Sequence, residues 1–119
     1  AVNHYLWNIN TRGTLVESLA ATNLAIEWAT GDWSNKVYQG IHAYTDHPEV
    51  SINKRTIAWL RAHAHYDDLH PVEAMELIKL LCGENIELRD KAFNAVKNGL
   101  AYYEMALDEC YKVQQEDCL

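Results

Sequence analysis

Apolar residues recur at intervals of three and four positions along most of the chain, the period of an amphipathic helix. No stretch shows the strict alternation of apolar and polar residues that predicts a β-strand. In the last third of the chain the apolar series comes close to a seven-residue repeat, which is typical of helices packed in a bundle. That series contains Ile86, Phe93, Val96, Leu100, Tyr103, Leu107, Cys110 and Tyr111. The pattern predicts an all-α protein built as a helical bundle.

Local signals divide the chain into helices. Thr14 and Glu17 have the spacing of a capping box, so a long helix is expected from Leu15. This helix carries one stripe through Leu15, Leu19, Thr22, Ile26, Ala29 and Trp33, and a second inward row through Val16, Ala20, Asn23 and Glu27.

Other signals predict where the helices end. The run Thr30-Gly31-Asp32 predicts a break or kink, and Pro71 predicts a junction because proline disfavours helix at the residue before it but suits the first turn of a new one. Gly83 is expected to end a helix over 72–82, and a last helix is expected from about Ile86.

Length and charge limit the classes of function. With 119 residues, of which 49% are apolar, the chain is expected to form a single all-helical unit over residues 1–119. Its net charge of −7 argues against nucleic acid as a partner, and no apolar run approaches the ~20 residues that span a bilayer. The three cysteines have no C-x-x-C spacing, and the first residues lack the pattern of a signal peptide. These features predict a cytoplasmic protein without a membrane partner.

The stretch from His63 to His70 carries candidate metal ligands. If it is helical, the turn of ~100° per residue places His63, Asp67 and His70 within one arc of roughly 60°. Imidazole and carboxylate are ligands for iron, manganese and zinc. Glu27 lies between Ile26 and Trp28 on an otherwise apolar helix, where a carboxylate needs a charge partner or a proton. Glu27 is therefore the fourth candidate ligand.

A simpler interpretation of the same residues stays open. The histidines and aspartates can lie on a solvated face, with Glu27 paired to a lysine or arginine. Trp59 and Tyr66 flank His63 by one turn and are candidates for lining a substrate pocket. The other tryptophans, Trp7, Trp28 and Trp33, are expected in the core, and Cys82 is expected there as a small apolar residue.

Three segments together resemble the haem-oxygenase-like non-haem diiron oxidases and oxygenases, within the superfamily that includes thiaminase II and pyrroloquinoline-quinone synthase. The segments are Ala21-Thr22-Asn23-Leu24-Ala25-Ile26-Glu27, Thr30-Gly31-Asp32-Trp33-Ser34 and His63-x-x-x-Asp67-x-x-His70-Pro71-x-Glu73-Ala74. The resemblance implies a helical bundle of the haem-oxygenase-like type. It also implies iron ligation by Glu27, His63, Asp67 and His70, and activation of dioxygen.

The chain departs from that family in one respect. Members draw further ligands, typically a Glu-x-x-His pair, from the N-terminal half of the domain, and this chain has no such pair. The resemblance therefore covers the C-terminal half of the usual domain, and a site for two iron ions would have to be completed by the N-terminal half or by another copy. A homo-oligomer, or association with that half, is the expected assembly.

Three functions are compatible with this interpretation. The first is an oxygen-activating non-haem iron enzyme, or part of one, acting with O₂ on a small organic substrate. The second is a metal-free relative similar to thiaminase II or the quinone synthase, in which acidic and histidine side chains do acid–base work. The third is a non-catalytic helical interaction fragment whose exposed apolar stripe recruits a partner.

Overall fold

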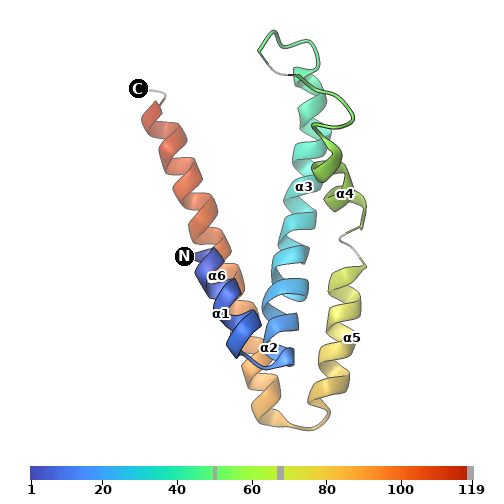
Figure 1. The fold of residues 1–119 in the computed structure, drawn as a ribbon, viewed down its shortest axis with the longest axis vertical. Helices are drawn as coiled ribbons and strands as arrows, with labels where there is room; N and C mark the ends of the chain where they lie inside the picture. Colours follow the sequence, from blue (N-terminus) through green and yellow to red (C-terminus); the bar gives the residue numbers. More distant parts are fainter. Residues whose placement is uncertain (50, 67–68, 118–119) are drawn as a thin grey trace.

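The computed structural model describes residues 1–49, 51–66 and 69–117. The described residues form helices with no strand among them, joined by short turns except between η2 and α4, where residues 45–49 and 51–57 lie outside the helices (Figure 1). The predicted all-α class is thereby confirmed. In chain order the elements are α1 (Val2–Arg12), α2 (Leu15–Leu19), the π-helix η1 (Ala20–Ile26), α3 (Glu27–Ile41), the 3₁₀-helix η2 (His42–Tyr44), α4 (Ala58–Tyr66), α5 (His70–Cys82) and α6 (Ile86–Asp117). None of the described helices is long and apolar enough to cross a membrane.

The predicted helix ends are largely confirmed. The Thr14 side chain accepts a hydrogen bond from the backbone N–H of Glu17, and the Glu17 side chain accepts one from the backbone N–H of Thr14, so the capping box is complete. Gly83 follows α5 with φ of +50°, a conformation that residues with a Cβ atom rarely adopt.

The predicted break at Thr30-Gly31-Asp32 is wrong, because α3 runs through these residues. Burial of the Thr30 side chain and the ion pair between Lys36 and Asp32, at 2.7 Å, stabilise the helix on both sides of Gly31. A glycine inside a helix costs only about 1 kcal/mol relative to alanine, so such contacts are sufficient to offset it. The irregular turn lies earlier, in the π-helix η1.

The core lies where α2 and η1 cross α5 and α6. It consists mainly of small side chains: Val16, Ala20, Ala21, Leu24, Ala74, Ile78, Cys82, Ala92 and Ala95. Gly99 of α6 lies so close to η1 that a Cβ atom there would be 3.1 Å from the Ala21 carbonyl oxygen. The expectation that Cys82 is buried is confirmed, and the inward row through Val16 and Ala20 is the buried one.

Away from this core the molecule opens into a V. α3 with α4 forms one arm and the C-terminal part of α6 forms the other, as Figure 1 shows. The radius of gyration is 17.1 Å, whereas a compact domain of this length has one of about 13.5 Å. Trp7 and Trp28 are 74% and 62% exposed, so the expectation that they lie in the core is wrong.

Candidate functional site

Glu27 and His70 meet at the start of two helices. Glu27 is the first residue of α3 and His70 the first residue of α5, and His70 Nδ1 lies 3.2 Å from Glu27 Oε2. The other carboxylate oxygen, Oε1, accepts a hydrogen bond of 3.0 Å from the side-chain amide of Asn23, one turn earlier in the chain. The carboxylate is thus held from two sides, by an amide and by an imidazole.

The two oxygens of Glu27 are not equally satisfied. Oε2 is buried, and among the described residues it has no hydrogen-bond partner. His70 Nδ1 is within ion-pair distance of it, but the two groups are not aligned as a hydrogen bond. A buried carboxylate oxygen that lacks a donor is costly, so this position favours a bound cation or a charged partner.

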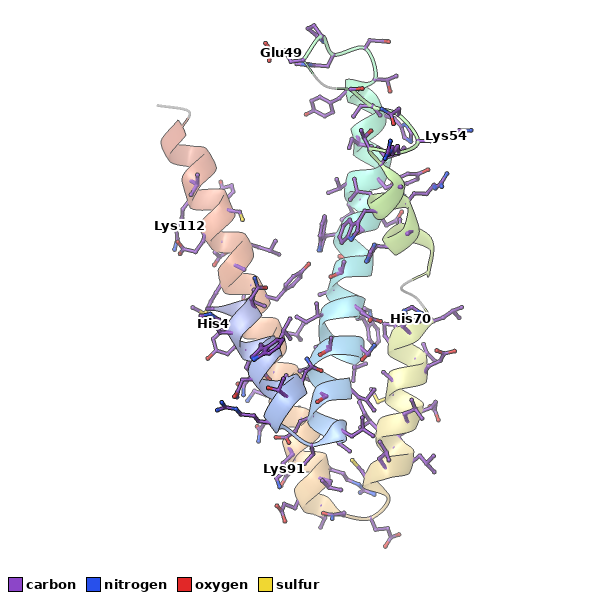
Figure 2. All side chains as sticks on the ribbon, in the orientation of Figure 1. His4, Glu49, Lys54, His70, Lys91 and Lys112 are labelled. Atoms are coloured by element: carbon purple, nitrogen blue, oxygen red, sulfur yellow. The ribbon has the colours of Figure 1, made fainter. Side chains whose placement is uncertain are left out.

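A small hollow opens beside this pair. It has a volume of about 190 Å³ and is lined by Glu27, His70 and Glu73 together with Asn23, Leu19, Ala74 and Leu77. Figure 2 places His70 at the N-terminal end of α5. Two carboxylates and one imidazole therefore border the same space.

His63 is positioned separately, on α4. Its Nδ1 lies 2.9 Å from the backbone carbonyl oxygen of Trp59, and its ring stacks on the Trp59 indole with centroids 3.9 Å apart. Because a carbonyl oxygen only accepts, Nδ1 is the protonated nitrogen, which leaves Nε2 as an acceptor in the neutral ring. Trp59 in turn packs against Trp33 of α3, with ring centroids 5.7 Å apart.

The single helical arc predicted for His63, Asp67 and His70 is wrong, because α4 ends at Tyr66 and His70 begins α5. Pro71 is the physical reason, since it has no backbone N–H to continue the hydrogen bonding of a preceding helix but suits the first turn of a new one. Asp67 lies outside the described residues, as does the side chain of Tyr66. Within the described part of the chain no three histidine, cysteine or acidic side chains gather as a metal-binding group.

Sequence reasoning missed a polar contact between the two arms. The Tyr103 hydroxyl of α6 accepts a hydrogen bond from Trp33 Nε1 and lies 3.1 Å from Thr30 Oγ1, both on α3. Thr30 is buried, and its contact with Tyr103 spans 73 positions of sequence. Only the helical stripe through Tyr103 pointed to this residue, and no local signal indicated its partners.

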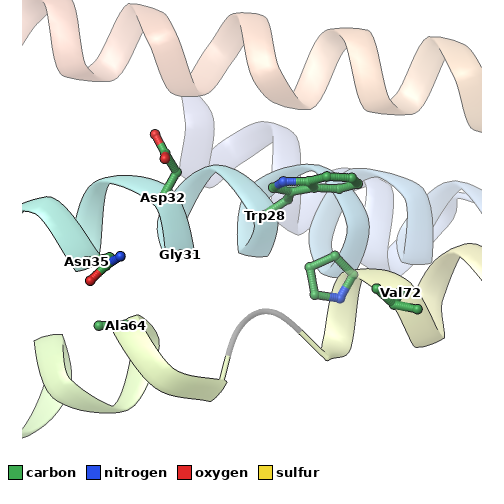
Figure 3. Close-up of a pocket in the computed structure, with 7 residues that line it drawn as sticks. Trp28, Gly31, Asp32, Asn35, Ala64 and Val72 are labelled. Atoms are coloured by element: carbon green, nitrogen blue, oxygen red, sulfur yellow. The ribbon is translucent and has the colours of Figure 1, made fainter.

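A larger cavity lies between α3 and the pair α4 and α5. Its volume is about 400 Å³, and its walls include Trp28, Gly31, Asp32 and Asn35 of α3, Ala64 of α4 and Val72 of α5. Figure 3 shows Asn35 on the side of α3 that faces Ala64. Pro71, next to His70, also lines it. Trp59 does not line this cavity, and the predicted pocket role of Trp59 and Tyr66 stays a prediction. The space is large enough for a small organic molecule.

A comparison with solved structures identifies a similar protein. A TenA homolog from Pseudomonas syringae pv. tomato superposes with a TM-score of 0.81 and 34% sequence identity, over 93% of this chain and 46% of the other. The chain has a haem-oxygenase-like helical fold. No family model matches the sequence, and no curated protein matches it.

The match supports the superfamily that contains thiaminase II, and the chain spans about half the length of the TenA homolog. The predicted bundle type is thereby confirmed. The likeness to the TenA homolog does not test whether the chain belongs to the diiron branch of the superfamily, so the predicted iron chemistry stays a hypothesis.

Proposed function

We propose that this chain supplies part of the metal site of an oxygen-activating non-haem iron enzyme that acts on a small organic substrate. Glu27, His63, Asp67 and His70 are the proposed ligands. One observation carries the proposal: the buried Oε2 of Glu27 lacks a hydrogen-bond donor among the described residues and lies beside the His70 imidazole.

The donor set fits iron. A carboxylate and an imidazole on the first turns of two helices are typical of metal sites in helical bundles. Asn23 holds Oε1, so Oε2 is the oxygen left for a cation. An iron ion held by mixed carboxylate and imidazole ligands supplies the reactive centre at which dioxygen is activated.

One contact of His63 supports its proposed role as a ligand. Metal-binding histidines commonly donate their other ring N–H to a backbone carbonyl, which fixes the tautomer. The Nδ1 contact with the Trp59 carbonyl does this, and stacking on Trp59 limits rotation of the ring. In this proposal Nε2 of His63 and the Asp67 carboxylate join Glu27 and His70 around the ion.

The surrounding residues have separate roles. Glu27 and Asp67 balance the charge of the ion, while the cavity between α3 and α5 receives the substrate next to Pro71. Trp28 forms one wall of this cavity.

Binding of ferrous iron under anaerobic conditions tests the proposal. Isothermal titration of the wild-type chain is expected to give saturable binding, and Glu27→Gln and His70→Ala are each expected to weaken it at least tenfold. Glu76→Gln is the matched control, because Glu76 lies on the exposed face of α5 in an ion pair with Lys79. Circular dichroism checks that all variants keep their helices. Equal affinity of wild type and Glu27→Gln would overturn the proposal.

A second candidate is a metal-free enzyme similar to thiaminase II, and the likeness to the TenA homolog favours it. In that case Glu27, oriented by Asn23, exchanges a proton with His70 during acid–base catalysis. A cysteine nucleophile is harder to accommodate, because Cys82 ends α5, about 18 Å along the helix from His70. Any activity that survives removal of metal by a chelator supports this candidate over the first.

A further inference from the structure

Four aromatic side chains from α3, α4 and α6 form a continuous row of contacts. The His63 ring stacks on the Trp59 indole with ring centroids 3.9 Å apart, and Trp59 packs against Trp33 with centroids 5.7 Å apart. Trp33 Nε1–H then donates a hydrogen bond to the Tyr103 hydroxyl of α6. The row therefore connects a proposed metal ligand on α4 with a phenol on the opposite arm of the molecule.

The side chains in this row share one chemical property. Indole and phenol are among the side chains that most readily lose a single electron, and electrons pass rapidly between aromatic rings in contact. Every position of the row beyond His63 is tryptophan or tyrosine, although leucine or phenylalanine would serve equally well for packing alone. Trp33 and Tyr103 are partly buried, so the far end of the row is partly shielded from water.

We propose that these four side chains form a one-electron relay, in which an electron passes from Tyr103 through Trp33 and Trp59 to a metal centre at His63. The direction of transfer rests on the proposed function, because the oxidant is the iron centre after it has reacted with O₂. The path depends only on contacts between residues of this chain.

Tyr103 also has a route for its proton. The side chain lines a hollow of about 630 Å³ whose walls carry the carboxylates of Glu104 and Asp108. When Tyr103 is oxidised, its O–H bond breaks, the proton passes to water or a carboxylate in this hollow, and the electron reduces the iron centre by one unit. The neutral phenoxyl radical that remains accepts the hydrogen bond from Trp33, which stabilises it. A one-electron reductant such as ascorbate restores the phenol by giving back one hydrogen atom.

A photo-oxidant in place of iron tests the relay. Ala62→Cys puts a thiol on an exposed position of α4, three residues from Trp59 and so beside it on the helix surface. A ruthenium(II) tris(bipyridine) label on this thiol becomes a strong one-electron oxidant when a laser flash excites it and a cobalt(III) quencher removes an electron from it. Cys110→Ser and Cys118→Ser direct the label to position 62, because Cys82 is buried.

The labelled, metal-free protein is expected to form a tyrosyl radical, detected by electron paramagnetic resonance and transient absorption. Every sample carries Tyr66→Phe, which removes the tyrosine nearest to the label in sequence. Tyr103→Phe is expected to lower the yield of the radical at least tenfold, and Trp33→Phe is expected to slow its formation at least tenfold. Tyr102→Phe is the matched control, because Tyr102 stacks on Tyr5, with ring centroids 4.9 Å apart, rather than on the relay.

Three results would each refute the relay: no tyrosyl radical in the labelled protein, a radical that persists in Tyr103→Phe, or a rate of formation that Trp33→Phe leaves unchanged. Circular dichroism checks that the variants keep their helices, and the first of these results needs no variant of the relay at all. The samples contain no iron, so a failure of the relay leaves the ferrous iron titration unchanged. A failure of iron binding likewise leaves the photo-induced radical unchanged, and the two failures are distinguishable.

Discussion

His70 Nδ1 lies 3.2 Å from Glu27 Oε2 and joins the first turn of α5 to the first turn of α3. The two residues are far apart in sequence, and Pro71 brings them together by starting a new helix at His70. Both residues line the small hollow, and their chain neighbours Trp28 and Pro71 line the larger cavity. Residues that orient this pair should therefore control what the site binds.

Asn23→Ala tests the orientation of Glu27. Loss of the 3.0 Å hydrogen bond to Oε1 frees the carboxylate to rotate, so the proposed ferrous iron affinity is expected to fall about 10- to 100-fold. Anaerobic isothermal titration measures the change. Asn94→Ala, on an exposed position of α6, is the control and should bind iron as the wild type does. Unchanged affinity in Asn23→Ala would show that this amide does not position a ligand.

The helical class, the capping box and the Gly83 terminus were predictable because each depends on residues within one or two turns. The same local reasoning failed at Thr30-Gly31-Asp32, where burial of Thr30 against another helix stabilises α3. Propensity is a weak guide when tertiary contacts oppose it.

The candidate site was predictable in composition and only partly in geometry. A lone carboxylate between apolar neighbours identified Glu27, and a set of ligand-type residues at helical spacing identified His70; the structure brings these two together. The single arc with His63 assumed one helix, and the chain uses two. Exposure of Trp7 and Trp28 was not predictable either, because their expected burial rested on residue type, which does not reveal whether another helix packs against the side chain.

Tyr103→Phe tests the polar contact between the arms. The change removes the hydroxyl that Trp33 and the buried Thr30 contact, so unfolding free energy is expected to drop by about 1 kcal/mol. Urea denaturation followed by circular dichroism measures it. Tyr111→Phe is the control, because Tyr111 is 63% exposed and the substitution should be neutral. A Tyr103→Phe protein as stable as wild type would mean that this contact adds nothing to stability.

Two glycine-to-alanine substitutions are expected to change the stability of the protein in opposite directions. At Gly99 a Cβ atom would lie 3.1 Å from the Ala21 carbonyl oxygen and 3.5 Å from the Ala25 Cβ, so Gly99→Ala should push α6 away from η1 and destabilise the protein by about 1–3 kcal/mol. At Gly40 an added Cβ atom would meet nothing within 4 Å beyond its chain neighbours and the adjacent helix backbone, so Gly40→Ala should stabilise α3 by about 0.5 kcal/mol. The melting temperatures of both variants and the wild type, measured by thermal denaturation, test these two expectations. If Gly99→Ala stabilised the protein, α6 and η1 would not be in close contact at Gly99.

The Thr14–Glu17 capping box gives an expected dependence of stability on pH. The hydrogen bond from the Thr14 backbone N–H, followed by the one from its side chain, lowers the pKa of Glu17 below its ordinary value of 4.5. A carboxylate with a lowered pKa stabilises the folded state fully above its ordinary pKa. This contribution is lost as the pH falls through the pKa of the folded state.

Glu17→Gln isolates this contribution. Near neutral pH the variant is expected to be less stable than wild type, and the difference in unfolding free energy should shrink as the pH is lowered below 4.5. Thr14→Ala should cost about 1 kcal/mol, since it removes the cap itself. Glu84→Gln, at an exposed position after Gly83, controls for the general loss of a negative charge. If the difference in unfolding free energy between wild type and Glu17→Gln did not change with pH, the negative charge of Glu17 would not be what stabilises the protein.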